Sequence, residues 1–370
     1  MKTAAILLSR QKIYPSGACN WVKASIEAAK WVKNQNLTLF SSVGIQTWEF
    51  LLFLGTYFNI NQCIIIPSPD QRSFLNTCGW IKDNFRLSNA SVWFKALYSN
   101  EKANVSTIRD RFIVENANVI IPVSIRDAGE MALLINEAQL IGKTIVTDFQ
   151  IKYERRDAPV KYFVHNENIN NELDEINSRY LIHWTRSSKN AWPNESRDSY
   201  YSAVISSIEY PRDAFNTLKN IVTTRLLVGS SLHISKNQSV VCFSGSPLEQ
   251  FIQLMRWRSR YKCMSFEPFG IGIEKEYALK LGVRPVIYTD KRDKSERYEC
   301  WQVQTKGKIG DWEKENEYRY RGDLDLSIIP RNKMICLCLY TFQAEMIERI
   351  SGIKAISIQP KKEKNFVASS

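Results

Sequence analysis

The chain has 370 residues, of which 44% are hydrophobic and 24% charged, and its formal net charge is +12. This length predicts two domains, and the absence of any apolar run near the ~20 residues of a bilayer span argues against a membrane protein. The positive charge predicts an anionic partner such as nucleic acid, a nucleotide or phosphate, although a merely basic surface would give the same value.

The eight cysteines include no CxxC pair. Cys336 and Cys338 alternate in an apolar run, but no second ligand pair has zinc-like spacing, so we predict no metal site. The thiols are expected to be small core residues in a reducing cytoplasm. The apolar start of the chain, residues 1–8, is too short for a signal peptide and is expected to form a buried strand.

The first half alternates apolar runs with amphipathic segments. Strands are predicted at residues 3–8, 37–40, 62–66, 118–123 and 144–146, and helices at 20–34, 46–58, 71–85 and 130–140. The third strand is expected to end at Pro67. Continuous apolar strands between amphipathic helices predict an α/β domain with a parallel sheet covered on both faces.

Two strand-to-helix turns in this half are rich in small and polar residues. They are Ser41–Gly44 and Ser124–Gly129. Free backbone N–H groups and the helix dipole at such turns suit phosphate binding, and Gly44 and Gly129 allow close approach of the backbone. Neither turn matches the dinucleotide-binding or P-loop pattern, and a glycine that simply closes a tight turn explains each equally well.

The order of these pieces resembles the SLOG superfamily, which includes the LOG proteins and the DNA-processing protein A fold. Arg109-Asp-Arg111 is expected to stand before a helix, then come the strand Val119–Val123 and the turn from Gly129 into Glu130. Ser42-Val-Gly44 with Glu49 is similar to the family's first glycine turn. The resemblance covers roughly residues 1–150.

The SLOG resemblance implies a Rossmann-like domain that binds a nucleotide or a nucleic-acid phosphate. Gly44, Gly129, Arg109 and Glu130 are the ligand-binding candidates that it suggests. It also raises the hydrolysis of nucleotide glycosidic bonds as an activity, for which Glu130 is the residue to test.

Residues 151–178 are polar and charged and are predicted to link the halves. Residues 179–360 mix strands and helices, which predicts an α+β domain, and residues 361–370 form a basic tail. Strands are predicted near residues 180–184, 239–244, 269–273, 284–288, 334–340 and 355–358, and helices near 197–207, 211–221 and 343–350.

Three segments of the second half carry candidates for chemistry. The run Tyr180–Arg186 contains His183 and Thr185 at the end of a predicted strand, although a lone histidine there is more often structural. Basic and aromatic residues alternate in Arg256-Trp-Arg258 and the residues after it, which suits phosphate contacts or a solvated helix face. In a strand, Glu317 and Arg319 would share a face, which fits either a structural salt bridge or a catalytic carboxylate.

Together these segments resemble ADP-ribosyltransferase folds, particularly the DNA-targeting DarT-like group. The resemblance covers roughly residues 180–345. It implies that His183 and Thr185 orient NAD, that Arg256 or Arg258 holds its phosphates, and that Glu317 polarises the acceptor or the ribose. NAD is therefore the cofactor that it suggests.

Three functions follow as hypotheses. The leading one is a cytoplasmic enzyme of a bacterial phage-defence or DNA-modification system that transfers ADP-ribose to a nucleic-acid base, DNA more than RNA. The second is direct modification of a base in DNA, such as hydration of the nitrile of a 7-deazaguanine, with Glu317 as general acid and base. The third is a sensor or adaptor in which both domains bind ligands without catalysis.

Overall fold

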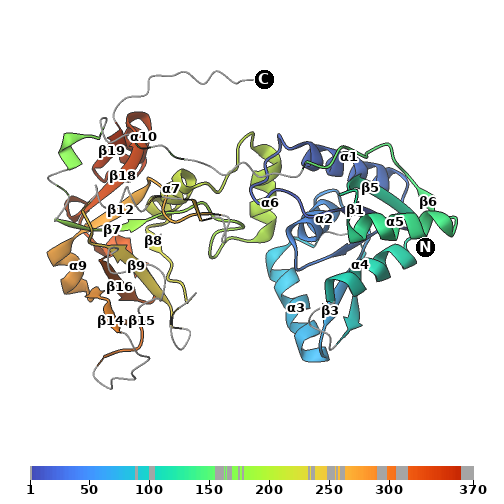
Figure 1. The fold of residues 1–370 in the computed structure, drawn as a ribbon, viewed down its shortest axis with the longest axis horizontal. Coiled ribbons are helices and arrows are strands. Elements are labelled where there is room, and N and C mark those ends of the chain that lie inside the picture. Colours follow the sequence, from blue (N-terminus) through green and yellow to red (C-terminus); the bar gives the residue numbers. More distant parts are fainter. Residues whose placement is uncertain are drawn as a thin grey trace. The chain divides into compact units, whose positions relative to one another are not determined.

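A computed structural model gives the fold of most of the chain (Figure 1). It describes residues 2–87, 91–99, 105–154, 169–173, 179–231, 238–247, 263–289, 298–305 and 316–359, together with residues 162, 164, 176, 234, 255, 257 and 258.

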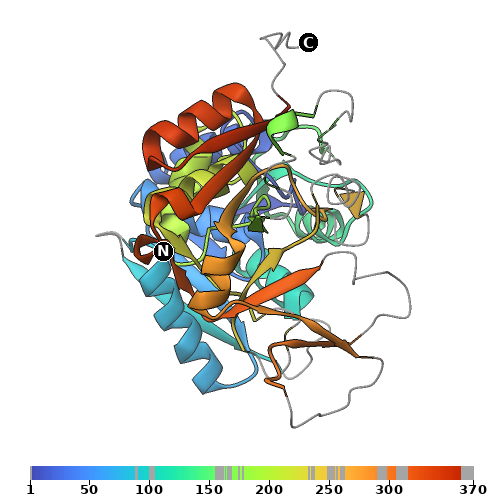
Figure 2. The same cartoon turned by 90° about the vertical axis from the view of Figure 1, so that its left-hand side faces the viewer.

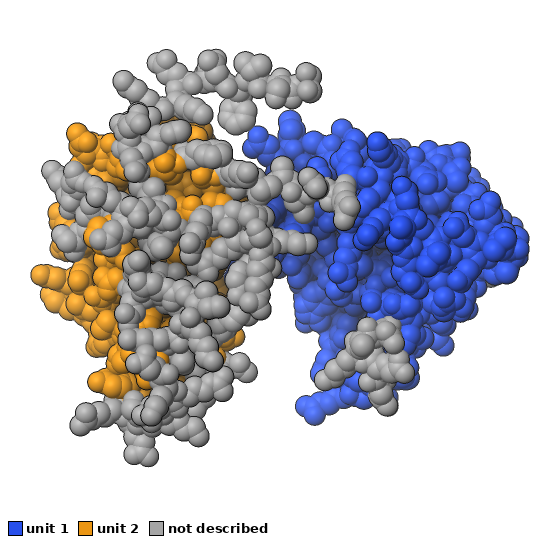
Figure 3. Space-filling model, in the orientation of Figure 1, with its two compact units in different colours: residues 1–157, 189–211 blue, residues 158–188, 212–370 orange. Residues whose placement is uncertain are grey.

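The chain divides into two compact units (Figure 3). Unit 1 comprises residues 1–157 and 189–211, and unit 2 comprises residues 158–188 and 212–370. The first crossing lies within the segment that the sequence analysis assigned to a linker. The segment 189–211, which was assigned to the second domain, folds back into unit 1.

Unit 1 contains a six-stranded sheet in which every pairing is parallel. Its strands are β1 (Thr3–Leu8), β2 (Thr38–Ser42), β3 (Gln62–Ser68), β4 (Val92–Tyr98), β5 (Val119–Ser124) and β6 (Thr144–Ile145), in the order β4-β3-β2-β1-β5-β6. The predicted parallel α/β sheet is confirmed. The edge strand β4 was not predicted. The expectation that Pro67 ends the third strand was wrong, because Pro67 pairs with Leu97 within β3 and β4.

Helices cover both faces of this sheet. They are α1 (Asn20–Asn34), α2 (Gln46–Tyr57), α3 (Gln71–Asn84), α4 (Val105–Asn116) and α5 (Glu130–Leu140). Right-handed crossovers place α1, α2 and α3 on one face and α4 and α5 on the other, and the contacts of α1 with α2 and of α4 with α5 agree. Arg109-Asp-Arg111 lies inside α4, which corrects the expectation that it precedes a helix.

Helix α6 (Arg197–Ser206) explains why residues 189–211 belong to unit 1. Tyr200 and Tyr201 are completely buried, and the Tyr201 ring lies 5.6 Å from the rings of both Phe50 and Phe53 on α2. Aromatic side chains bury large apolar areas, so this contact holds the helix against α2. The Gly17 amide also donates to the Ser207 carbonyl, at 2.8 Å.

Unit 2 contains a seven-stranded mixed sheet in the order β13-β16-β9-β7-β12-β18-β19. These strands are β7 (Tyr180–Trp184), β9 (Val240–Ser244), β12 (Gly270–Glu274), β13 (Arg284–Pro285), β16 (Glu317–Arg321), β18 (Met334–Tyr340) and β19 (Ala355–Gln359). Only β18 and β19 pair in parallel among these strands. The predicted α+β character of this half is confirmed.

Helices α7 (Ala214–Thr224), α9 (Lys275–Leu281) and α10 (Thr341–Ser351) belong to the same unit, and α10 lies along β18 and β19 (Figure 2). Short paired strands are β8 (Leu226–Leu227) with β17 (Leu324–Asp325), β10 (Trp257–Arg258) with β11 (Cys263–Met264), and β14 (Ile287–Thr289) with β15 (Val303–Thr305). Single turns of 3-10 helix cover Asn171–Leu173, Leu326–Ile328 and Arg331–Lys333.

The two faces of the unit 2 sheet bury different sets of side chains. One face packs against α7, α9 and α10 and includes Leu181, Phe243 and Ile271. The other face includes Ile182 and Ile335 and packs against Ile169, Leu173 and Ile176. Because side chains alternate along a strand, this division assigns each residue of β7, β9 and β16 to one face.

Candidate functional site

The strand order of unit 1 places a topological switch point between β1 and β5. The chain runs outward from β1 through β2, β3 and β4, and then returns to β5 on the other side of β1. The connections that follow β1 and β5 therefore leave toward opposite faces of the sheet. In open α/β sheets, ligands bind in the crevice that this divergence opens at the carboxyl ends of the strands.

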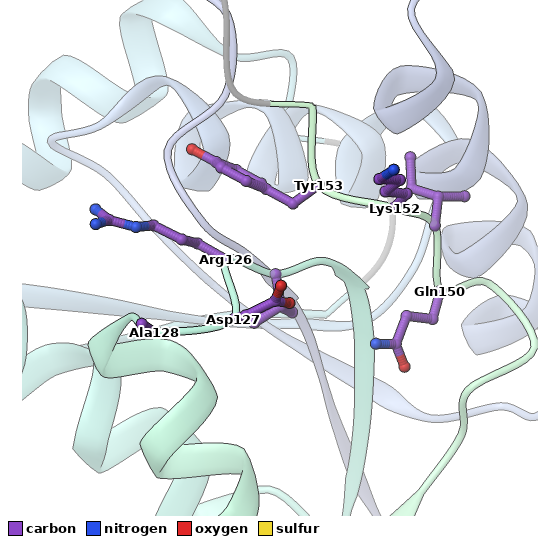
Figure 4. Close-up of a pocket in the computed structure, with 8 residues that line it drawn as sticks. Arg126, Asp127, Ala128, Gln150, Lys152 and Tyr153 are labelled. Atoms are coloured by element: carbon purple, nitrogen blue, oxygen red, sulfur yellow. The ribbon is translucent and has the colours of Figure 1, made fainter.

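A pocket of about 580 Å³ lies beside this point (Figure 4). It is lined by the turn after β5 and by the segment after β6, namely Ile125, Arg126, Asp127, Ala128, Gln150, Ile151, Lys152 and Tyr153. Figure 4 shows Arg126 and Tyr153 extending in the same direction from these two segments. The pocket thus combines two cations, one carboxylate and an aromatic ring.

Backbone pairing fixes the segment after β6 against the end of β5. The Ile151 amide donates to the Val123 carbonyl at 2.8 Å, and Ile151 forms a parallel bridge with Ser124. The Tyr153 hydroxyl donates to the carbonyl of Arg10, in the loop after β1, at 2.9 Å. The pocket wall is therefore tied to both strands of the switch point.

Hydrogen bonds fix the backbone of the turn after β5, as they fix the segment after β6. The Arg126 amide donates to the Ser9 hydroxyl at 3.0 Å, and the Gly129 amide donates to the Arg126 carbonyl at 3.1 Å. These bonds leave the Arg126 and Asp127 side chains exposed. A flexible cation on a fixed backbone is suited to pair with an anionic group that enters from solvent.

Of the residues predicted for ligand binding, Gly129 and Glu130 lie next to this pocket. Gly129 is the N-cap of α5 and closes the turn that carries Arg126. Glu130 is exposed in the first turn of α5, and its carboxylate interacts with Arg111 of α4. Neither side chain lines the pocket.

Gly44 and Arg109 come together at the other glycine turn. Gly44 has φ +96°, and the Arg109 Nη1 donates to the carbonyl of Val43 at 3.1 Å. The Arg109 side chain is 3% exposed, and its hydrogen bond to Val43 joins this turn to α4. Next to this turn, Glu49 Oε2 in the first turn of α2 lies 3.5 Å from Arg197 Nε of helix α6.

The structure does not bring His183 and Glu317 to one site. Glu317 pairs with Ser244, and Ser244 pairs with Ile182, so Glu317 shares the face of Ile182. His183 follows Ile182 and therefore points to the opposite face. Its ring lies 6.0 Å from the Phe243 ring, on the side of α7, α9 and α10.

His183 is half-buried, and its Nδ1 is bonded to the carbonyl of Cys242 at 2.8 Å. Burial lowers the pKa of His183, and the positive charge of Arg186 adds to the effect. Thr185 is buried, and its hydroxyl faces the carbonyls of Ala214 and Phe269 at 3.0 and 3.1 Å. The His183 contact joins β7 to β9, and the Thr185 contacts join the residue after β7 to the start of α7 and to the residue before β12, as structural side chains do.

Glu317 takes part in a buried ion pair. Its two carboxylate oxygens accept from Arg319 Nε at 2.9 Å and Nη2 at 3.1 Å. Arg319 also donates to the Trp301 carbonyl at 2.9 Å and to Gln304 Oε1 at 2.8 Å. The pair therefore ties β16 to the segment that contains β15, which agrees with the structural alternative for Glu317.

Cys242 stands beside this ion pair, because it is the cross-strand partner of Arg319. Solvent reaches its side chain, although protein atoms surround the thiol on most other sides. Burial and the negative charge of Glu317 raise the pKa of Cys242 to about 12. The thiol is therefore protonated at neutral pH and is a poor nucleophile.

The remaining predicted residues cannot be placed in a site. Arg256 lies outside the described residues, and only the backbone of Arg258 is described, in β10. The described residues contain no cluster of three or more His, Cys, Asp or Glu side chains that could hold a metal ion. None of the helices in the described ranges has the length and hydrophobicity that crossing a bilayer requires.

Sequence reasoning found one wall of the pocket and missed the other. The turn Ser124–Gly129 was recognised, but Lys152 and Tyr153 were assigned to a linker because they begin a highly charged run. The available signal was a cation followed by an aromatic residue, a few positions after the last strand predicted in the first half, residues 144–146. The chain matches no protein-family model, and neither a curated protein nor a solved structure is similar enough to count as a match.

Proposed function

We propose that unit 1 is a nucleotide-binding domain and that the pocket beside β5 holds the ligand. The observation that carries this proposal is the placement of Arg126, Lys152 and Tyr153 around one pocket at the switch point of a parallel sheet. The net charge of +12 favours an anionic ligand of this kind.

Each side chain has a distinct task in this proposal. Arg126 binds a phosphate through paired N–H donors, and Lys152 adds a second positive charge. The ring of Tyr153 stacks on the base, and Asp127 accepts hydrogen bonds from sugar hydroxyls. This division makes phosphate recognition and base recognition separable by mutation.

The test is calorimetric titration with ATP, AMP, NAD, inorganic phosphate and a single-stranded DNA oligonucleotide. Arg126→Ala should weaken nucleotide binding by about 1.5–3 kcal/mol, the range for hydrogen bonds to charged groups. Lys33→Ala is the matched control, because Lys33 is exposed in the last turn of α1, which leads into the amino end of β2, whereas the pocket lies at the carboxyl end of β5. Equal affinity in Arg126→Ala and the parent protein would refute the proposal.

Tyr153→Ala gives an independent readout. It should weaken AMP binding by roughly 1–3 kcal/mol, the contribution of one stacked base, and leave phosphate binding unchanged. Tyr153→Phe keeps the ring and should bind AMP as the parent does. Preference for the oligonucleotide over all mononucleotides would redirect the proposal from a nucleotide to a nucleic-acid phosphate.

The chemistry expected of unit 2, ADP-ribosyl transfer to DNA or direct base modification, stays a prediction. The separation of His183 and Glu317 onto opposite faces gives it no support from a shared site. Mass spectrometry of DNA incubated with the protein, with and without NAD, distinguishes the two. A mass increase that needs NAD indicates ADP-ribosylation, and a change without NAD indicates direct modification.

A further inference from the structure

Strand β4 forms one edge of the unit 1 sheet, but it has the composition of an interior strand. It runs over seven residues, Val92–Tyr98, with no proline or glycine and with one charged side chain, Lys95. In the described part of the chain, no strand pairs with its outer side. Proteins commonly protect such edges, because the unpaired backbone groups pair readily with another chain.

The other edges of the two large sheets are protected. β6 and β13 are each two residues long, and β13 contains Pro285. Asn170 occupies the outer side of β19, where its amide and its side chain donate to the carbonyls of Ile358 and Ser357 at 3.1 and 3.3 Å. Among the edges that the structure describes, β4 is therefore the exception, which indicates that it has a partner strand.

The backbone of β4 directs half of its polar groups away from β3. The Ser91 carbonyl accepts a hydrogen bond from β3 at 3.0 Å, and the Ser99 amide donates one to β3 at 3.1 Å. Because successive residues of a strand turn their N–H and C=O groups to opposite sides, the odd-numbered residues of β4 face β3. The outward groups belong to Val92, Phe94, Ala96 and Tyr98.

Antiparallel pairing of β4 with a second copy of itself allows registers that differ in what faces Lys95. A two-fold axis at Lys95 opposes this lysine to its own copy, and like charges directly opposite are destabilising. An axis at Ala96 opposes it to Leu97, which offers a cation no favourable contact. An axis at Phe94 opposes it to Trp93 of the second copy, whose 41% exposed ring can bind a cation. The strand is thus complementary to itself in one register.

Helix α3 presents a second self-complementary surface above the same edge. Lys82 Nζ lies 5.9 Å from the centre of the Phe94 ring, so this side of α3 faces β4. Gly79 and Leu75 lie three and seven residues before Lys82 and therefore share its side of the helix. Leu75 is 58% exposed, and a Cβ added to Gly79 would meet nothing within 4 Å. This side combines an exposed apolar side chain with an open notch.

Pairing of two β4 strands brings the two α3 helices to packing distance. Each α3 contacts β3 and β4, the two outermost strands of its sheet. Because neighbouring strands are about 4.8 Å apart, helices centred over these strand pairs lie about 9.6 Å apart in the joined sheet. Packed helices are about 8–10 Å apart. Leu75 of each copy can then pack near Gly79 of the other.

We infer that β4 is a dimer interface, at which two copies of this chain pair their β4 strands antiparallel around a two-fold axis at Phe94. The occupant is a second copy, because the strand opposes its own cation to its own aromatic ring. β4 and β5 are separated by three strands in the sheet order. The inference therefore does not depend on the proposed function of the pocket beside β5.

The test is sedimentation equilibrium of the full chain at physiological ionic strength, which screens the repulsion between two chains of charge +12. The parent protein should be a dimer at micromolar concentrations. Trp93→Lys places like charges opposite each other twice in the dimer and should raise its dissociation constant by about tenfold or more. Leu140→Lys is the matched control, because it adds the same charge at an 87% exposed position of α5 and should leave the dimer intact.

Two further variants test the strand and its register. Adding Lys95→Glu to Trp93→Lys opposes the new lysine to the new glutamate of the other copy and should restore the dimer. Ala96→Pro removes an outward amide but no hydrogen bond to β3, so it should give a folded monomer by circular dichroism and decides the question if Trp93→Lys does not fold. A monomeric parent, a dimer that persists in Ala96→Pro, dissociation by Leu140→Lys, or failure of Lys95→Glu to restore the dimer overturns the inference.

Discussion

The ion pair between Glu317 and Arg319 makes unit 2 sensitive to the loss of either partner. Arg319 is 4% exposed and Glu317 is 16% exposed as side chains. Arg319→Met leaves a mostly buried carboxylate without its partner and removes the donors to Trp301 and Gln304. Removing one partner of a buried pair costs about 3–5 kcal/mol, and partial exposure of Glu317 places the expected loss near the lower end.

The double variant Glu317→Met, Arg319→Met should recover much of this stability. It removes both charges together and leaves only the Trp301 carbonyl and the Gln304 amide without their donor. That residual cost is about 1–3 kcal/mol. With a loss of about 3 kcal/mol for either single variant, the two single losses together exceed the loss in the double variant by roughly 3–5 kcal/mol. That difference is the expected coupling energy, at or above the upper end of values for residues in one network.

Urea denaturation of the four proteins of this cycle gives the coupling energy. Hydrogen exchange of peptides from β9 and β16 should accompany it, because two units can unfold in separate transitions. Additive losses, with coupling below about 0.5 kcal/mol, would show that the pair does not act as a structural unit. The cycle is also the necessary control for any loss of activity in a Glu317 variant.

Three more changes test other parts of the structure. Cys242 should react slowly with iodoacetamide at pH 8 despite its exposure, because its pKa is raised to about 12. Glu317→Gln should accelerate the reaction, since it removes a negative charge beside the thiol. Alkylation of Cys242 as fast as that of free cysteine would contradict this expectation. Gly17→Ala should loosen α6 in hydrogen exchange, because the added Cβ would clash with the backbone oxygen of Ile205 in α6. Gly79→Ala is the control and should have no such effect, because its Cβ would meet nothing within 4 Å. Lys143→Met should lower the free energy of unfolding of unit 1 by about 1.5–3 kcal/mol, because the Lys143 ammonium donates to the carbonyls of Val114, Glu115 and Ala117 at the end of α4. Thermal denaturation measures this loss, and an unchanged melting temperature would exclude that contribution.

Local patterns in the sequence predicted most of the elements of the fold. The predicted first strand, residues 3–8, and the predicted helix 130–140 match β1 and α5 residue for residue. Such segments carry their own signal, because apolar periodicity and turn residues act over short distances. The edge strand β4 was missed, since it alternates half-buried and exposed positions and has no continuous apolar run.

The candidate sites depended on which segments meet in space. The sequence indicated the turn that carries Arg126, but only the bridge between Ser124 and Ile151 brings Lys152 and Tyr153 to the same pocket. In the same way, α6 was predicted as a helix, but its burial against Phe50 and Phe53 places it in unit 1. Contacts between distant segments leave no periodic mark in either one.

For the second half, the sequence by itself predicted a strand around His183 and fitted a strand around Glu317, but it did not decide which face of the sheet either side chain takes. Strand register decided that question: Ile182, not His183, lies in the row of Ser244 and Glu317. A shift of one residue in pairing would have put His183 on the face of Glu317, because side chains alternate with a period of two. Only the tertiary structure fixes such a register, since cross-strand hydrogen bonds and the two packed faces select it together.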